Sequence, residues 1–326
     1  MTVALVTGLA GQDGSYLTES LLAQGFEVHG VVRSASDAAP IAAAHPSVII
    51  HALDLADTEG IDRLVTDTSP DEIYNLAAIS SVYQSWQEPV LTARVNALAV
   101  VQLVDSAWNL QVSTGRPVRF VQASSAELFG QATVAPQDER TSIAPVSPYG
   151  AAKAYAHHIV SVYRGRGLAA ANCVLYNHES PRRPESFVTR KITAGAARIS
   201  RGLQETLQLG TLAVRRDWGW APDYTRALEM ALRAERPDDF VIATGETHEL
   251  SEFLAIAFAR VGIEDWRRHV EIDPAFSRPV DPTEQVGDAS KAREILGWST
   301  TRTFAEVVEA MVDADLAVLD GAGISG

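Results

Sequence analysis

The chain has 326 residues, of which 46% are apolar and 21% charged, and its formal net charge is −14. This acidity opposes general binding to nucleic acid or to an anionic membrane surface, so we expect neither as a partner. The single cysteine, Cys173, excludes an internal disulfide and a cysteine-rich metal site. No apolar run approaches the ~20 residues of a membrane span, and a glycine follows the first apolar run too soon for a signal peptide, so we expect a cytoplasmic protein without a metal.

Short apolar runs alternate with helical patterns over the first half of the chain. Each run stops at a glycine or a polar residue, which is typical of a strand buried on both faces of a parallel sheet. The alternation predicts an α/β domain with a doubly wound parallel (Rossmann) sheet and right-handed crossovers. The predicted strands are residues 3–7, 27–32, 48–53, 72–76, 118–122 and 171–176, and the predicted helices are residues 15–24, 60–67, 89–108 and 149–164.

After residue 177 the alternation loosens, and the positive charge of this acidic chain gathers between residues 182 and 216. One basic cluster in an acidic protein suggests a small anionic ligand such as a diphosphate, although Arg198 and Arg201 fit a solvated helix face. We predict a second, smaller α/β substrate lobe here. The main domain would comprise residues 1–177 and 212–245, and the lobe residues 178–211 and 246–326, with helices at 187–201, 251–261 and 304–318 and a strand at 240–244 that returns to the main sheet.

The turn after the first predicted strand carries three evenly spaced glycines, Gly8, Gly11 and Gly14. Without side chains, the backbone turns tightly and approaches a pyrophosphate closely. Gln12 and Asp13 lie in this turn before the next helix, whose unpaired N–H groups and positive dipole end favour phosphate. In this strand–turn–helix context the glycines predict dinucleotide binding rather than a plain tight turn.

The end of the second strand distinguishes between the two nicotinamide dinucleotides. NAD-binding chains usually place an acid there for the ribose 2′-hydroxyl, whereas Arg33 suits a 2′-phosphate. This favours NADP as the cofactor over NAD, although an exposed surface arginine would look the same. The ends of the third and fourth strands are expected to border the cofactor through Asp54, Leu55, Leu76, Ala77 and Ala78.

Two further motifs carry candidate catalytic side chains. Tyr149 and Lys153 are four residues apart on one helix face, where a nearby ammonium would lower the pKa of the tyrosine and make it a general base. Ser125 and Glu127 follow the fifth strand, at the sheet edge where ligands bind. Ser125 can donate a hydrogen bond to a sugar oxygen, whereas Glu127 is a carboxylate that also fits a surface or helix-capping position.

Together these motifs resemble the extended short-chain dehydrogenase/reductase family. The run Gly11–Leu17 and four later stretches narrow the resemblance to the GDP-mannose 4,6-dehydratases. The resemblance covers nearly the whole chain, and its later stretches are more specific than the glycine loop. They are residues 177–183, 187–193, 216–219 and 239–248.

The resemblance implies a role for each group of residues. The main domain would bind NADP and the lobe a GDP-sugar, and the family's assemblies imply a homodimer or homotetramer, with the loop after Arg33 reaching a neighbouring subunit. Ser125 stands where the family has a threonine, and the other matches to catalytic positions are Glu127, Tyr149 and Lys153. Matches to cofactor positions include Arg33, His178 and Arg183, and matches to GDP-sugar positions are Asn177, Val188, Lys191, Arg216 and Arg278.

Two residues and one short run depart from the family pattern. Ala126 replaces a serine, Phe129 replaces a tyrosine, and the run Ile79–Val82 looks more like the 4-keto-6-deoxymannose reductases of the same superfamily. Two other functions therefore stay open. One is a 4-keto-sugar reductase or 4-epimerase, neither of which needs a base at C5, and the other is a catalytically silent NADP-binding regulatory protein.

The favoured hypothesis is a hydro-lyase that oxidises, dehydrates and re-reduces one sugar with a single tightly bound NADP. Tyr149 would take the C4 hydroxyl proton as hydride leaves C4, with O4 hydrogen-bonded by Ser125 and the phenolate sustained by Lys153. A C4 ketone makes the C5 proton acidic, so Glu127 would remove it as water leaves from C6. Because Ala126 is inert, we expect the protonated Glu127 to assist departure of the C6 hydroxyl as well.

Overall fold

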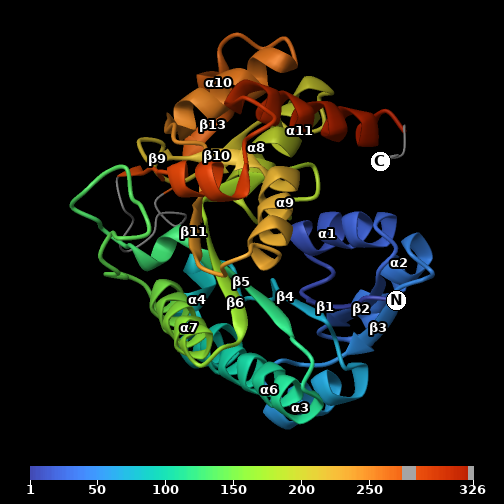
Figure 1. Cartoon of the computed structure of the whole chain (residues 1–326). Helices are drawn as coiled ribbons and strands as arrows, with labels where there is room; N and C mark the ends of the chain where they lie inside the picture. Colours follow the sequence, from blue (N-terminus) through green and yellow to red (C-terminus); the bar gives the residue numbers. More distant parts are fainter. Residues whose placement is uncertain (274–283, 322–326) are drawn as a thin grey trace.

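The computed structural model describes residues 1–273 and 284–321, and a seven-stranded parallel sheet forms its centre (Figure 1). The strand order is β3-β2-β1-β4-β5-β6-β11, so the chain winds outward from β1 in one direction and then returns to β4 on its other side. This reversal makes the carboxyl ends of β1 and β4 the point at which doubly wound sheets bind ligands. The strands are β1 (Val3–Thr7), β2 (Glu27–Val32), β3 (Ile49–Ala52), β4 (Glu72–Asn75), β5 (Arg119–Ser125), β6 (Ala169–Leu175) and β11 (Asp239–Ile242).

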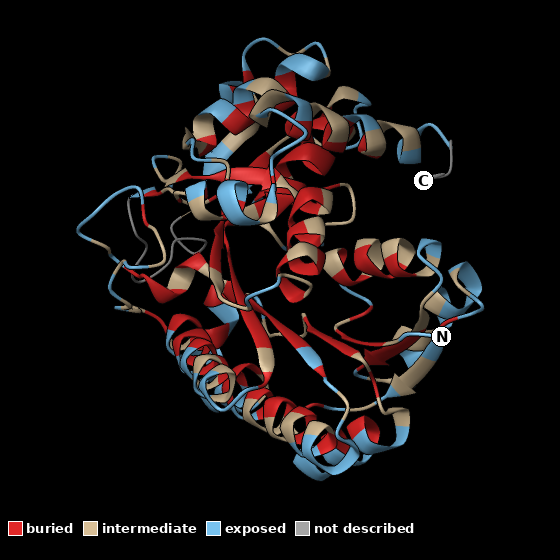
Figure 2. Ribbon diagram, in the orientation of Figure 1, coloured by how far each residue is buried: buried red, intermediate tan, exposed pale blue. Residues whose placement is uncertain are grey.

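Helices cover both faces of this sheet. On one face α1 packs against α9, and fully buried side chains such as Leu17 and Leu228 fill the core between them and the strands. On the other face α3, α6 and α7 enclose a second core that contains Leu103 and Val160. The sheet between them is largely buried (Figure 2), which explains why its strands are almost continuously apolar. These helices are α1 (Gln12–Ala23), α3 (Thr58–Thr68), α6 (Ala99–Thr114), α7 (Pro148–Gly165) and α9 (Ala221–Leu232).

One helical stretch contradicts the expectation that nothing in the chain approaches a membrane span. Residues 89–114 form α5 (Pro89–Ala93), a π-helical turn η1 (Arg94–Leu98) and α6 without a break. The stretch is long enough for a span, and its most apolar part has a mean hydropathy of 1.3. Half of that apolar part is buried inside the protein, and Leu103 lies in the core against the sheet. A core helix meets the same criterion, so the stretch carries little weight as a membrane segment.

The second lobe lies above the sheet in Figure 1 and has a core of its own. That core is formed by fully buried residues such as Phe253 on α10 and Met311 on α11, which pack against α8. Parallel pairing of β7 with β10 begins where β6 ends, so the chain enters the lobe directly from the main sheet. The elements are α8 (Val188–Ser200), α10 (Leu250–Arg260), α11 (Phe304–Leu319), β7 (Asn177–Glu179), β8 (Leu207–Leu209), β9 (Arg215–Arg216), β10 (Trp218–Trp220), β12 (His248–Glu249), β13 (Val270–Ile272) and β14 (Glu284–Gln285).

The predicted parallel sheet is confirmed, including the return of residues 240–244 to it as β11 beside β6. Within the described residues, three α-helices were not predicted: α2 (Ala35–Ala44), α4 (Val82–Gln87) and α9. The α2 sequence contains Pro40 and buries no side chain, so it lacks both the propensity and the pattern of a helix. The boundaries of the two domains stay a prediction.

Candidate active site

The glycine loop lies between β1 and α1, where it lets main-chain segments approach closely. A Cβ atom at Gly8 would lie 2.8 Å from the Ala77 nitrogen, and a Cβ atom at Gly14 would lie 2.3 Å from the Gly8 carbonyl oxygen. Gly11 is the N-cap of α1 and offers no side chain to the first N–H groups of the helix. Those donors and the positive end of the helix dipole make the loop a cradle for a pyrophosphate.

Replacement of Gly14 by alanine is expected to close this cradle. The new methyl group would clash with main-chain atoms of Gly8, which cannot rotate away as a side chain would. Overpacking of this kind costs about 1–3 kcal/mol, so the melting temperature should fall and bound NADP should be lost. Thermal unfolding and cofactor release measure both effects. Gly165→Ala is the control, because a Cβ there meets no atom within 4 Å, and a Gly14→Ala variant that keeps its NADP and its melting temperature would contradict the cradle.

Thr7, a residue that the sequence did not single out, organises the floor of this cradle. Its hydroxyl donates to Asn75 Oδ1 at 2.6 Å and accepts from the Leu76 and Ala77 nitrogens at 3.1 Å. Asn75 in turn donates to Gln122 Oε1 at 2.7 Å, which joins the carboxyl ends of β1, β4 and β5. Buried polar residues at three adjacent strand ends are the sequence signal that could have identified this network.

Further predicted cofactor positions follow the ends of β2, β3 and β4. Arg33 is exposed, and within the described part of the chain it forms no ion pair, so its guanidinium is accessible to a phosphate. Asp54 is exposed and accepts from the Ala56 nitrogen at 2.9 Å, whereas the Leu55 side chain is buried in the core. Ala78 is half-buried beside the Thr7 network. All of these residues lie on the carboxyl edge of the sheet, as predicted.

The π-helical turn in the long helix holds the loop that follows β4. Asn96 accepts from the Ile79 nitrogen at 2.8 Å and donates to the Ile79 carbonyl oxygen at 3.0 Å. Turns of this kind occur often at functional sites because they redirect one side chain without breaking the helix. Asn96 was not predicted from the sequence, where a polar amide in the middle of an apolar helix was the available signal.

Tyr149 and Lys153 lie on the buried face of α7, one turn apart. Ser147 caps the helix by accepting from the Gly150 nitrogen at 3.0 Å, and Pro148 occupies the first position, so the start of α7 is fixed. The Lys153 ammonium donates to the Ala123 carbonyl oxygen at 2.8 Å and lies 5.8 Å from the centre of the Tyr149 ring. The predicted pair is thus brought together beside the end of β5.

Ser125 and Glu127 lie next to this pair. Ser125 ends β5 and accepts from the Glu127 nitrogen at 3.2 Å, which starts the short 3-10 turn η2 (Ala126–Leu128). A Cβ atom at Gly150 would lie 2.5 Å from the Glu127 carbonyl oxygen, so a glycine is needed for α7 to approach this turn. Glu127 is partly buried rather than turned out to solvent, and its charge acts on the Tyr149 hydroxyl. The structure therefore gathers a hydroxyl, a carboxylate, a phenol and an ammonium.

The predicted lowering of the tyrosine pKa is wrong for this arrangement. Burial raises the pKa of Tyr149 to about 12, a hydrogen bond with Ser125 opposes the rise, and the charge of Glu127 adds to it. Burial also lowers the pKa of Lys153 to about 8, against the opposing charge of Asp13. Desolvation dominates both groups because they lie inside the protein, and the Lys153 ammonium is engaged by a carbonyl oxygen instead of the phenol.

The predicted substrate positions lie on the lobe side of the same edge. Asn177 begins β7 beside Trp218, and Val188 begins α8 with 39% of its surface exposed. Lys191 is half-buried, and burial lowers its pKa against the opposing charge of Asp273. Arg216 is 5% exposed on β9. Nearby, the predicted cofactor position Arg183 stacks on the Phe187 ring at 3.8 Å. Arg278 lies outside the described residues.

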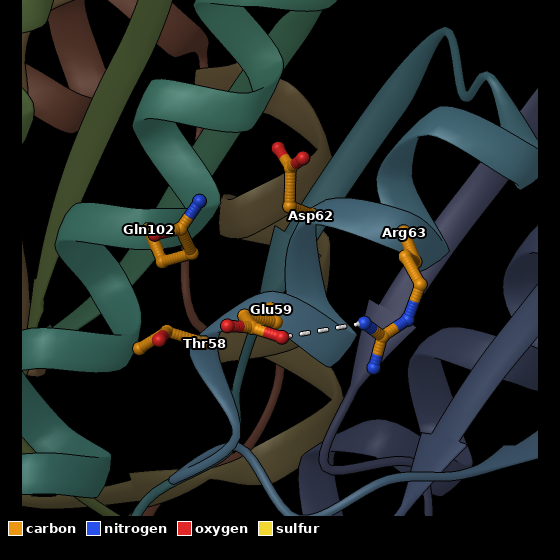
Figure 3. Close-up of a pocket in the computed structure, with 5 residues that line it drawn as sticks. All are labelled: Thr58, Glu59, Asp62, Arg63 and Gln102. Carbon is orange, nitrogen blue, oxygen red and sulfur yellow. Dashed lines mark ion pairs between the residues drawn. The ribbon is translucent and has the colours of Figure 1, made fainter.

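A separate hollow lies between the start of α3 and α6 (Figure 3). It is lined by polar side chains, among which Glu59 and Arg63 form an ion pair at 3.6 Å. None of the predicted catalytic or substrate residues that the structure describes borders it. The hollow is therefore distinct from the candidate active site.

A doubly wound sheet with a glycine cradle, and a Tyr–Lys pair on the helix beside its carboxyl edge, defines a dehydrogenase/reductase of the extended short-chain class. The family model described as GDP-mannose 4,6 dehydratase matches residues 5–311, and the chain belongs to this family. The chain is 45% identical to GDP-mannose 4,6 dehydratase 1 of Arabidopsis thaliana over 325 residues, covering 96% of this chain and 90% of that protein. It is 39% identical to the GDP-mannose 4,6 dehydratase of Homo sapiens, covering 97% and 92%.

A solved structure supports the fold independently. The UDP-glucose 4-epimerase of Thermus thermophilus, in complex with NAD, superposes with a TM-score of 0.82 at 27% identity. The match covers 96% of this chain and 99% of the epimerase. The predicted family, fold class and enzyme class are thereby confirmed.

Proposed function

We propose that this protein converts GDP-mannose to GDP-4-keto-6-deoxymannose and water, using a tightly bound NADP. The observation that carries the proposal is the position of Glu127, partly buried and acting on Tyr149. Membership of the GDP-mannose 4,6-dehydratase family supports the same reaction. Neither a reductase nor a 4-epimerase requires a carboxylate base at this place.

The residues of the main domain suit NADP. Gly8, Gly11 and Gly14 leave the space that a pyrophosphate requires, and the uncapped start of α1 supplies donors. Arg33 is accessible for the 2′-phosphate, which favours NADP over NAD. When bound, NADP would accept a hydride from C4 of the sugar and return it to C6.

The first role of the protein is to take the C4 hydroxyl proton. Tyr149 accepts it, Ser125 hydrogen-bonds O4, and the Lys153 ammonium stabilises the nearby negative charge. Because burial raises the pKa of Tyr149 to about 12, Tyr149 is a neutral phenol near neutral pH and must lose its own proton to solvent before it can accept this one. The ketone formed at C4 then acidifies the proton at C5.

The second role is elimination of water. Glu127 removes the C5 proton and passes it to the departing C6 hydroxyl, because Ala126 carries no acidic side chain. Glu127 is then a carboxylate again, while Tyr149 still holds the O4 proton. The proton that C5 finally receives must therefore come from Tyr149 or from solvent. One water is released for each sugar converted.

The lobe would hold the GDP end of the substrate. Lys191 and Arg216 lie at its edge and, together with Arg278, are the cations proposed to bind the diphosphate. Asn177 and Val188 are proposed to contact the sugar nucleotide beside them. Binding energy from this remote part of the substrate positions C4 and C5 against Tyr149 and Glu127.

A panel of nucleotide sugars tests the proposal. The purified protein is incubated with each nucleotide sugar and no added NADPH, and the mass of each product is measured by mass spectrometry. GDP-mannose is expected to lose one water. The run Ile79–Val82 favours a 4-keto-sugar reductase as the second candidate, and a reductase would leave GDP-mannose unchanged, as would a silent NADP-binding protein.

We also propose that the protein assembles as a dimer of this chain through the outer faces of α4, α5, η1 and α7. These helices pack against one another, and they expose large apolar side chains to solvent. Apolar surface on adjacent helices is typical of a protein–protein interface. The exposed side chains are Tyr83, Trp86, Val90, Leu91, Leu98, Tyr155 and Val162.

A charge in this surface is expected to separate the subunits. Leu98 is 51% exposed, so Leu98→Asp should leave the fold of one chain intact while it places a desolvated carboxylate in the interface. Light scattering after size-exclusion chromatography should show dimers for the wild type and monomers for the variant. Leu203→Asp, at a 65% exposed position of the lobe, is the control. Monomeric wild-type protein would refute the interface.

A further inference from the structure

His178 lies between the glycine loop and the start of the second lobe, with both ring nitrogens bound to oxygen atoms. Nδ1 is 2.7 Å from the Tyr176 carbonyl oxygen, and Nε2 is 2.9 Å from Asp13 Oδ2. A carbonyl oxygen and a carboxylate both accept, so each nitrogen must donate a proton. The ring is 9% exposed and stacks on Tyr224, with centroids 4.5 Å apart. The geometry is that of a buried imidazolium paired with a carboxylate.

The charges around the ring favour this protonation state. Burial alone would lower the pKa of His178, but the charge and hydrogen bond of Asp13 outweigh it and raise the pKa, against a smaller opposing effect of Arg183. Burial would likewise raise the pKa of Asp13, yet His178 holds it below its usual value. The ring also stacks on Tyr224 of α9, which is neutral because its pKa is raised. Arg183, whose charge acts on His178, is paired with Glu179 at 3.3 Å.

Asp13 lies where its charge would affect a bound diphosphate. Asp13 is the second residue of α1, in the first turn of the helix that forms the pyrophosphate cradle. A bare carboxylate there would repel a bound diphosphate across the cradle. The charge of Asp13 also acts on both Tyr149 and Lys153, so an unbalanced Asp13 would disturb the catalytic pair as well.

Gln12 extends the connection between the loop and the lobe. Its amide donates to Asp13 Oδ1 and to the His178 carbonyl oxygen, each at 3.1 Å, and accepts from Ser180 at 2.8 Å. Both side chains at the start of α1 are thus turned toward residues 178–180 and are held there.

We propose that His178 acts on cofactor binding through Asp13: as an imidazolium it cancels the carboxylate at the start of α1 and so allows the glycine loop to accept a diphosphate. His178 is then a positioning residue, and this role rests on the proposed NADP binding. Loss of the imidazolium, by substitution or by deprotonation, leaves a negative charge beside the cradle.

A double-variant cycle on the whole protein tests this role, with NADP⁺ as the probe and its Kd as the measurement. His178→Gln is expected to raise the Kd for NADP⁺ by roughly tenfold or more, because the Asp13 carboxylate beside the bound anion loses its ion-pair partner. Asp13→Asn removes that charge and should weaken NADP⁺ binding less than His178→Gln does. The double variant Asp13→Asn/His178→Gln should recover most of the loss, which a merely structural His178 would not permit.

The pH profile provides a second measurement if His178→Gln does not fold. Because the pKa of His178 is raised, the imidazolium persists below that pKa and is lost as pH rises through it, so wild-type affinity should fall there while that of Asp13→Asn stays level. Equal weakening by both single variants, without recovery in the double variant, would overturn the proposal, as would identical pH profiles. If the wild type binds no NADP⁺ at any pH, the proposed function itself fails and the role of His178 fails with it.

Discussion

Glu127→Gln is expected to reduce conversion of GDP-mannose by roughly 10²–10⁴-fold, the usual contribution of one positioned acid or base. The amide has nearly the same shape as the carboxylate but cannot remove the C5 proton. Oxidation at C4 depends on Tyr149 and should still occur. Mass spectrometry of the bound sugar nucleotide should therefore show loss of two hydrogens without loss of water, and hydrogen exchange at C5 should nearly stop.

A matched control separates this effect from a general loss of charge. Glu59→Gln alters a carboxylate on α3 that is remote from the active site and 88% exposed, so turnover should not change. If Glu127→Gln kept its C5 exchange and product formation, Glu127 would have no part in elimination. The protein would then be better described as a plain oxidoreductase.

Tyr149→Phe is expected to lower turnover by a similar ~10²–10⁴-fold factor, but at an earlier step. Without the Tyr149 hydroxyl no group accepts the proton of the C4 hydroxyl, so neither the ketone nor the dehydrated product should form. The ring fills the same buried space, and the melting temperature should stay near that of the wild type. A mass difference of two hydrogens therefore distinguishes Glu127→Gln, which forms the ketone, from Tyr149→Phe, which does not.

Tyr163→Phe is the control for this second variant, because it removes a hydroxyl from the same helix, where it donates to Asp105. It should retain turnover. If Tyr149→Phe retained turnover as well, the O4 proton would have to leave by another group, and Tyr149 would not be the base at C4.

The sheet was predictable because its strands are buried on both faces. A strand such as β5 lies between two cores, so its apolar run is nearly continuous and is recognisable without reference to its neighbours. α9 was missed for the opposite reason. It buries Asp223, Thr225 and Glu229 along with its apolar residues, so no polar face marks it as a helix.

The candidate site was predictable where chemistry depends on spacing. The four-residue interval fixes Tyr149 and Lys153 on one face of a helix, and strand ends fix Ser125 and Arg33 on one edge of a sheet. The direction of the Tyr149 pKa shift was not predictable, because desolvation depends on burial that the interval does not specify. The pairing of Asp13 with His178 joins residues 165 positions apart, which only the folded chain brings together.

GDP-mannose labelled with deuterium at C4 tests the central claim most directly, namely that one site removes hydrogen from C4, eliminates water and returns the same hydrogen to C6. With no cofactor added, we predict a product that has lost one water and carries the deuterium at C6. Deuterium that stays at C4 or exchanges into solvent, or a substrate that keeps its water, would contradict the assignment of Tyr149 and Glu127 to one dehydratase site.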